Sequence, residues 1–254
     1  MNLLLALAFL FFMGSVFGWV LELLFRRFLS SANPERKWTN PGFCTGPYLP
    51  LYGSGLCVLF LLAQLEQRQW LSDPAWNRVL LFAIMAVSMT VIEYLSGLLA
   101  LKVAKLRLWD YSSQWGNIQG LICPKFSLIW ALLGAGYYFL IHPHILEALT
   151  WLSRNLAFSF FIGLFFGVFL IDAGHSIQLT AKLKRFADEN QIIVRYESLK
   201  QSIRAHQEQA REKYRFFAPF HSELPLRQHL KLWKEELDRR IADQESRHTL
   251  HKSK

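Results

Sequence analysis

Five apolar runs alternate with polar loops along the first 180 residues of the chain. They cover about residues 3–25, 48–65, 79–101, 121–141 and 157–175. Each approaches the roughly 20 apolar residues that cross a bilayer as a helix. The second run is short and rich in glycine, which leaves open whether it spans the membrane or re-enters it. The pattern predicts an all-α fold: a polytopic membrane protein with five transmembrane helices.

One motif occurs twice, each time at the start of an apolar run. Both copies read Trp-x-Asn and place a proline seven residues after the asparagine; they are Trp38, Asn40 and Pro47, then Trp115, Asn117 and Pro124. Each copy follows an apolar run that carries one glutamate, Glu22 or Glu93. Because internal repeats mark repeated structural units, we predict a duplicated helical hairpin: repeat 1 at about 3–65, repeat 2 at about 79–141, and a fifth helix at about 157–175.

The charged residues are separated from the apolar runs. The chain has a net charge of +9, and most of its Lys and Arg lie in residues 181–254. We therefore expect a transmembrane domain, 1–180, followed by a cytoplasmic helical hairpin tail, 181–254. Apolar residues step by three and four in two stretches of this tail, with Pro219 and Pro225 between them. An antiparallel coiled coil and a basic face against anionic lipid both remain open for these helices.

The distribution of Lys and Arg among the loops predicts an orientation. Residues 26–47, 102–120 and the tail are richer in these residues than 66–78 and 142–156. Basic loops stay in the cytoplasm, so we expect a multi-pass protein of the cell (plasma or inner) membrane, with its N-terminus outside and its C-terminus cytoplasmic. The polar residues of the membrane domain then lie in its cytoplasmic half.

Two glutamates are the sharpest candidates for a functional site. Glu93 lies within MAVSMTVIEYLSGLLA and has no basic residue three or four positions away. A charged side chain at the centre of a membrane helix costs about 2.5–3.5 kcal/mol on insertion scales. Glu22 has Arg26 one helical turn later, which allows a local ion pair. For both glutamates the alternatives are a structural hydrogen bond between helices and a role in binding or proton handling.

Other polar residues are expected at the same depth. Asn40 and Asn117 suit helix caps, and Lys125 either reaches the lipid headgroups or neutralises Glu93. Asp172 and His175 share one helical face. A metal site that includes them is the weaker interpretation, and a polar cluster at the helix end is the stronger one. The predicted ligand-binding residues are Glu22, Asn40, Tyr52, Glu93, Asn117, Lys125, Asp172 and His175, with no metal.

Several familiar motifs are missing from the sequence. It has no G-x4-G-K-[ST] phosphate loop, no H-E-x-x-H and no G-x-S-x-G. Its three cysteines form no CxxC pair. We therefore expect no cofactor and no nucleic-acid partner, and the polar composition favours a chain without enzyme activity of its own.

The motifs of the first 175 residues resemble a known bacterial family. GWVLELLFRR, TNPGFCTGPYLPLYGSG, VIEYLSG and LWDYSSQWGNIQGLICPKFSLIW together resemble the Putative ABC-transporter type IV family, the CmpB-like permease proteins. Pro41 stands where the family more often has arginine, and Leu51 where it usually has isoleucine. The positions that match the family pattern are Gly18, Trp19, Glu22, Asn40, Gly42, Gly46, Pro47, Pro50, Tyr52, Gly53, Glu93, Asp110, Tyr111, Asn117, Gly120 and Trp130.

The resemblance implies a permease component whose ATP hydrolysis belongs to a separate ATPase subunit that docks on the 102–120 loop. We expect a transporter or permease subunit with an inward-facing polar site, embedded in the lipid bilayer, with homo-oligomerisation left open. A non-catalytic assembly or scaffold subunit is one alternative. A membrane enzyme that acts on lipid head groups is the other.

Overall fold

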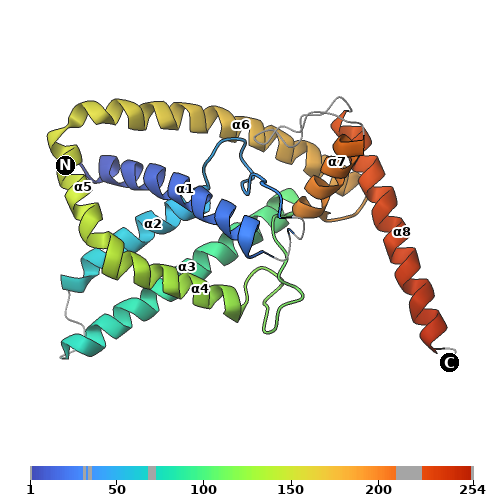
Figure 1. Ribbon diagram of the computed structural model, residues 1–254, viewed down its shortest axis with the longest axis horizontal. Coiled ribbons are helices and arrows are strands. Elements are labelled where there is room, and N and C mark those ends of the chain that lie inside the picture. Colours follow the sequence, from blue (N-terminus) through green and yellow to red (C-terminus); the bar gives the residue numbers. More distant parts are fainter. Residues whose placement is uncertain (1, 31–32, 34–35, 68–72, 210–224, 253–254) are drawn as a thin grey trace.

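Figure 1 shows a computed structural model that describes residues 2–30, 33, 36–67, 73–209 and 225–252. The chain is mostly helical. Its main helices are α1 (Leu3–Phe28), α2 (Pro50–Ala63), α3 (Pro74–Ala104), α4 (Pro124–Gly136), α5 (His142–Arg154), α6 (Ser159–Glu189), α7 (Tyr196–Gln209) and α8 (Leu226–Lys252). The shorter elements are η1 (Gln64–Gln67), β1 (Leu106–Arg107), the π-helical turn η2 (Tyr137–Ile141), η3 (Leu156–Phe158) and β2 (Val194–Arg195).

The starts of the helices follow from local sequence. Asn2 caps α1 by accepting a hydrogen bond from the backbone N–H of Leu4, and Asp73 caps α3 in the same way. Pro50, Pro74 and Pro124 each occupy the first turn of a helix, where the missing N–H has no helical partner to lose.

Four helical segments are long and apolar enough to cross a membrane. They are α1, α3, the continuous segment Pro124–Arg154 and the segment Leu156–Glu189. The second apolar run forms only the 14-residue helix α2, which at about 1.5 Å per residue is shorter than the hydrocarbon core of a bilayer. The described residues therefore contain four candidate spans and one short apolar helix, where five transmembrane helices were expected, the second of them either spanning or re-entrant.

Two helices extend beyond the expected limits. Residues 142–156 were expected to form a loop, but α4 continues through η2 into α5. Pro143 lies at the start of α5, where its missing N–H is accommodated by the wide π-helical turn before it. The fifth helix was expected to end near residue 175, but α6 runs unbroken to Glu189. Its last turns are rich in Ala, Lys, Leu and Arg, which favour a helix in water as well as in an apolar environment.

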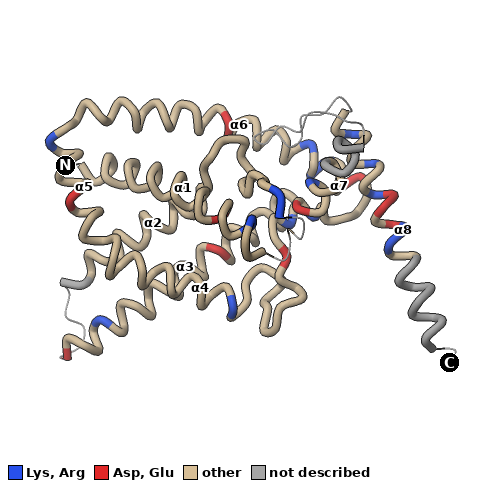
Figure 2. Tube along the Cα trace, in the orientation of Figure 1, with Lys and Arg blue, Asp and Glu red and all other residues tan. Residues whose placement is uncertain are grey.

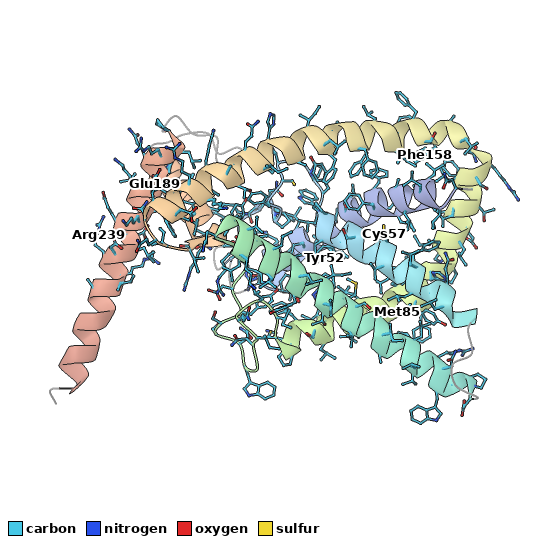
Figure 3. All side chains as sticks on the ribbon, turned by 180° about the vertical axis from the view of Figure 1, so that it is seen from behind. Tyr52, Cys57, Met85, Phe158, Glu189 and Arg239 are labelled. Carbon is cyan, nitrogen blue, oxygen red and sulfur yellow. The ribbon has the colours of Figure 1, made fainter. Side chains whose placement is uncertain are left out.

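The largest apolar core lies between α1, α2, α3 and the α4–α5 segment. Leu10, Met85 and Leu152 are fully buried there. α1 and α2 pack very closely at small residues, because a Cβ atom on Gly53 would lie only 2.2 Å from Ser15 Oγ. Figure 3 shows Tyr52, Cys57 and Met85 within this part of the molecule, with Phe158 at one end and Glu189 and Arg239 at the other.

A second core joins the tail helices to the ends of α3 and α6. Leu106, Leu183, Leu199 and Trp233 are among its buried members. β1 and β2 pair in parallel beside it, with Leu106 opposite Val194. In Figure 1 the tail helices lie at the end of the molecule where α3 and α6 finish, and α8 extends away from the rest. Pro219 lies outside the described residues.

Candidate functional site

Glu93 is the most unusual polar residue of the membrane part. Its side chain projects from α3 into the protein and is only 3% exposed. Oε1 accepts a hydrogen bond of 3.1 Å from the hydroxyl of Tyr111, which lies in the loop between α3 and α4. Oε2 has no hydrogen-bond partner among the described residues. A buried carboxyl group with one unsatisfied oxygen is costly as an anion, so this environment favours the neutral, protonated form.

Glu22 lies close enough to Glu93 for the two carboxyl groups to interact electrostatically. Its Oε2 accepts a hydrogen bond of 2.9 Å from Tyr52, and its Oε1 accepts one of 2.9 Å from Nε of Arg26. The structure therefore brings together three residues expected at one site, Glu22, Tyr52 and Glu93. The neighbouring Arg26 compensates the charge of Glu22, whereas no described basic side chain does so for Glu93.

Aromatic residues enclose the two carboxyl groups. The rings of Tyr52 and Trp130 are 5.2 Å apart between centroids, and Trp130 lies beside Glu93. Tyr111 stacks on Phe126 at 4.3 Å with nearly parallel planes. Burial, and then the Glu93 carboxylate, raise the pKa of Tyr111 well above its ordinary value, so its hydroxyl remains a donor. We call Glu22, Tyr52, Glu93, Tyr111 and Trp130 the carboxylate cluster.

Tyr111 and Trp130 were not among the expected binding residues. Both appear among the positions that match the family pattern, and that match was the available signal. Spacing alone gives no hint, since Tyr111 lies 18 residues after Glu93 in a loop.

Asn40 is placed apart from the cluster and holds its own loop. Its Oδ1 accepts hydrogen bonds from Trp19 Nε1 at 2.8 Å and from the backbone N–H of Gly42 at 3.0 Å. Its Nδ2 donates to the carbonyl oxygens of Cys44 and Thr45. All the hydrogen-bonding capacity of this buried amide is used in shaping the loop before α2.

Asn117 and Lys125 also lie outside the cluster. Asn117 Nδ2 donates to the carbonyl oxygens of Ser112 and Gln114, and its Oδ1 accepts from the N–H of Gly120. Lys125 is exposed, with Nζ 5.8 Å from the centroid of the Phe126 ring. It does not pair with Glu93, because it occupies the exposed first turn of α4, whereas Trp130 reaches the cluster from the buried face.

Asp172 fastens the loop before α2 to the middle of α6. Its carboxylate accepts hydrogen bonds from the backbone N–H groups of Thr45 and Gly46, at 3.1 and 2.8 Å, and from the hydroxyl of Tyr48. Figure 1 shows this loop beside α6. His175, one turn later, is exposed and does not join it. The structure thus separates Asp172 and His175 from Glu22 and Glu93, and the described residues contain no group of three His, Cys, Asp or Glu suited to a metal ion.

The loop between α3 and α4 is held by an ionic contact at its base. Arg107 contacts Asp110 at 3.1 Å, and Arg195 from β2 approaches the same carboxylate. Burial alone would raise the pKa of Asp110, but hydrogen bonds from Ser112 and the charges of both arginines lower it overall. This loop carries Tyr111, so the contact positions the hydroxyl that reaches Glu93.

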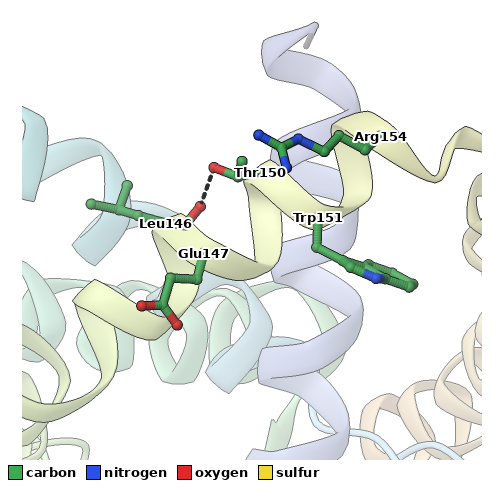
Figure 4. Close-up of a pocket in the computed structure, with 5 residues that line it drawn as sticks. All are labelled: Leu146, Glu147, Thr150, Trp151 and Arg154. Atoms are coloured by element: carbon green, nitrogen blue, oxygen red, sulfur yellow. Dashed lines mark hydrogen bonds between the residues drawn. The ribbon is translucent and has the colours of Figure 1, made fainter.

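Figure 4 shows a surface pocket on α5, lined by Leu146, Glu147, Thr150, Trp151 and Arg154. Thr150 donates to the carbonyl oxygen of Leu146 within the same helix. All five lining residues come from one helix that contributes nothing to the carboxylate cluster. We therefore do not assign the functional site to this pocket.

Comparison with known proteins gives one family match. The model of the family described as Putative ABC-transporter type IV matches residues 9–177, about two thirds of the chain. The matched range includes all five residues of the carboxylate cluster and ends within α6. No curated protein and no solved structure matches the chain.

Proposed function

The chain belongs to the Putative ABC-transporter type IV family, and from this premise we propose that it is the membrane subunit of a transporter in which the carboxylate cluster is an inward-facing site. The resemblance suggested by its motifs is thereby confirmed, and the apolar helices fit a membrane protein. We further propose that it resides in the cell membrane with its N-terminus outside and its tail in the cytoplasm, as its loop charges suggest.

The observation that carries the proposal is the environment of Glu93. Ionisable residues inside membrane segments are costly and are typical of substrate or proton pathways. A purely structural carboxyl group would use both oxygens in well-formed hydrogen bonds, but Oε2 of Glu93 has no hydrogen bond of normal geometry among the described residues, and only the Trp130 side chain is near enough to favour the charged form as Tyr111 does. We propose that Glu93 takes up and releases a proton, and that Glu22, held by Arg26 and Tyr52, supplies the neighbouring fixed charge.

An ATPase that acts with this subunit would be a separate chain, because the sequence has no phosphate loop. The loop between α3 and α4 is the proposed docking surface, since it lies at the end of the molecule that also holds the tail. Tyr111 of the same loop contacts Glu93. Movement of this loop by an ATPase would therefore act directly on the carboxylate cluster.

Purification of the tagged full chain in mild detergent, followed by mass spectrometry, tests this assignment. We expect a stoichiometric ATPase with the wild-type protein and also with Glu93→Gln, because Glu93 is buried away from any docking surface. Exchange of the exposed aromatic side chain of this loop, Trp115→Ala, is expected to weaken the association. A chain that purifies without any ATPase under conditions that preserve other membrane complexes would contradict the ATP-driven form of the proposal.

An assembly subunit is the second candidate, and the position of α8 favours it. This helix leaves the rest of the molecule in Figure 1, while Leu230 and Trp233 near its start are buried in the second core. Ending the chain after Ile241 would remove the distal part and keep those buried residues. Loss of partner association with an intact carboxylate cluster would support the assembly role, and unchanged association would oppose it.

A further inference from the structure

We propose that exposed basic residues at the ends of α3 and α6 bind the phosphate headgroups of anionic lipids. The group consists of Lys102, Lys105, Lys182, Lys184 and Arg185, and we call it the basic collar. This inference does not depend on transport, because it concerns the outer surface of the helices. Figure 2 shows Lys and Arg near the junction of α6 and α7, where α6 leaves a long stretch without Lys or Arg.

The length of the apolar face of α6 places the collar at headgroup depth. Exposed apolar side chains run from Phe160 to Ile177 along this helix. At 1.5 Å per residue the stretch from Ser159 to Ile177 is about 27 Å long, close to the roughly 30 Å hydrocarbon core of a bilayer. Lys182 follows a little more than one turn later, within reach of the interfacial region through its long side chain.

α3 ends at the same level as this part of α6. Its exposed apolar residues include Leu95, Leu99 and Val103, and the exposed Lys102 and Lys105 occupy its final turn and cap. The two helix ends are tied together, because Ala104 and Leu183 lie in one buried core. The backbone N–H of Val194, just beyond α6, donates to the carbonyl oxygen of Lys105. The basic groups of both helices therefore lie at one end of the molecule.

Most charges of the collar lack a partner within the described part of the chain. Lys102, Lys105, Lys182 and Lys184 form no ion pair there, whereas Arg185 contacts Glu189 at 3.0 Å with its side chain 84% exposed. A set of open cations directly above an apolar, lipid-facing surface complements a lipid with a negative headgroup and two acyl chains. A cation that contacts the headgroup is expected to strengthen binding roughly fivefold, and the contributions of several cations to one singly charged headgroup do not multiply.

The test uses the purified full chain in neutral detergent and dioleoyl phosphatidylglycerol as the probe, with dioleoyl phosphatidylcholine as the uncharged comparison. Native mass spectrometry gives the apparent affinity for each lipid. We expect preferential binding of phosphatidylglycerol, which weakens as salt is raised. The triple variant Lys182→Gln, Lys184→Gln, Arg185→Gln should bind it at least roughly fivefold more weakly, the effect of one lost cation at the headgroup. Its affinity for phosphatidylcholine should not change.

A matched variant separates the collar from net charge. Arg227, Lys231 and Arg239 are three exposed cations on α8, and their exchange to glutamine should leave phosphatidylglycerol binding within about twofold of wild type. The proposal is overturned if the collar variant keeps wild-type affinity, if both triple variants lose affinity equally, or if inorganic phosphate displaces the lipid at equal concentration. Thermal unfolding midpoints of both variants equal to that of the wild-type protein would show that both are folded.

Discussion

At the scale of single residues, the carboxyl group of Glu93 accepts a well-formed hydrogen bond from Tyr111, whereas its second oxygen has none of normal geometry among the described residues, although Trp130 lies close to the carboxyl group. Asp172 lies in a different setting, because three donors converge on its carboxylate. The first arrangement leaves a proton-binding position open, and the second satisfies a fixed negative charge. This contrast supports the proposal that Glu93 binds a proton, whereas the hydrogen bonds of Asp172 hold the loop before α2 on α6.

The reactivity of Cys44 is a measure of how tightly Asp172 holds the loop before α2. Burial raises the pKa of this thiol to about 11; a hydrogen bond involving Ser176 opposes this rise, and the Asp172 charge adds to it. Only the thiolate reacts readily with a maleimide. We predict that the rate of Cys44 alkylation, measured by mass spectrometry, keeps rising about tenfold per pH unit beyond pH 9. The rate for an ordinary thiol, with a pKa of about 8.5, begins to level off there.

The Asp172→Ala variant tests whether the Asp172 carboxylate keeps Cys44 buried. It removes the acceptor of the Thr45 and Gly46 N–H groups and of the Tyr48 hydroxyl, so the loop should open and Cys44 should react faster at every pH. A plateau of wild-type alkylation near pH 9, or an unchanged rate in Asp172→Ala, would contradict this description of the loop.

The sequence made some of these residues predictable and others not. Glu93 could be identified because an acidic residue in an apolar run, without a nearby cation, is costly wherever the helix packs. The task of Asp172 could not, because two of its three donors are backbone N–H groups more than 120 residues earlier in the chain. Asn117 looked like a site residue by its repeat position, but its bonds close a local turn.

At the scale of elements, α1 and α2 approach so closely that glycine is required at the contact. A Cβ atom on Gly18 would lie 2.2 Å from Cβ and 2.3 Å from Cγ of Tyr52. We predict that Gly18→Ala destabilises the protein by about 1–3 kcal/mol through overpacking and displaces the Tyr52 hydroxyl from Glu22. Thermal unfolding in detergent measures the effect.

Gly163→Ala is the matched control for this contact. Gly163 lies in α6, and nothing lies within 4 Å of a Cβ atom built there. Replacement by alanine should be neutral or stabilise the helix by up to about 1 kcal/mol. Equal unfolding midpoints for the two alanine variants would show that the tight packing of α1 on α2 is incorrect.

Helix limits illustrate what periodicity and composition can predict. The starts at Pro50 and Pro124 follow from residues that favour a first turn. The extension of α6 past residue 175 could not be predicted in this way. This polar part of the helix is stabilised by the packing of Leu183 and Phe186 against α7 and α8, which is a contact with distant segments of the chain. Residues 142–156 were expected to form a loop, yet the chain remains helical there, with a π-helical turn directly before Pro143.

At the scale of the whole molecule, an ionic contact between α1 and α7 helps to join the membrane part to the tail. Arg26 contacts Glu22 on its own helix and Glu197 on α7, at 2.9 and 2.8 Å. The buried Lys200 of α7 donates to the carbonyl oxygen of Asn40 at 3.0 Å. The tail therefore touches both the carboxylate cluster, through Arg26, and the loop before α2.

We predict that Glu197→Gln loosens α7 from the membrane part. Loss of a charge-assisted hydrogen bond costs about 1.5–3 kcal/mol, so hydrogen exchange in residues 192–203 should accelerate roughly tenfold to hundredfold. Glu189→Gln is the control, because its pair with Arg185 is largely exposed and contributes little. Equal exchange in both variants and wild type would mean that Arg26 does not hold the tail.

The overall organisation was only partly predictable from sequence. The apolar runs indicated membrane helices, and the motifs indicated the family. The attachment of the tail was not predictable, because it depends on a two-residue strand pair, Leu106 with Val194, and on apolar side chains scattered over four segments. The equivalence of the two repeats in space stays a prediction. The total of five membrane spans and the orientation in the membrane also stay predictions.

The state of Glu93 is measured most directly by its reaction with dicyclohexylcarbodiimide, which enters apolar regions and modifies protonated carboxyl groups. Peptide mass spectrometry at neutral pH should find Glu93 modified well ahead of Glu235, which is exposed on α8, outside the candidate membrane spans, and serves as the reference for a carboxylate in water. Glu93→Gln should remove the modification and remain folded. If Glu235 reacts as fast as Glu93, or if the membrane helices are modified equally in the variant, the carboxylate cluster is not a proton-binding site.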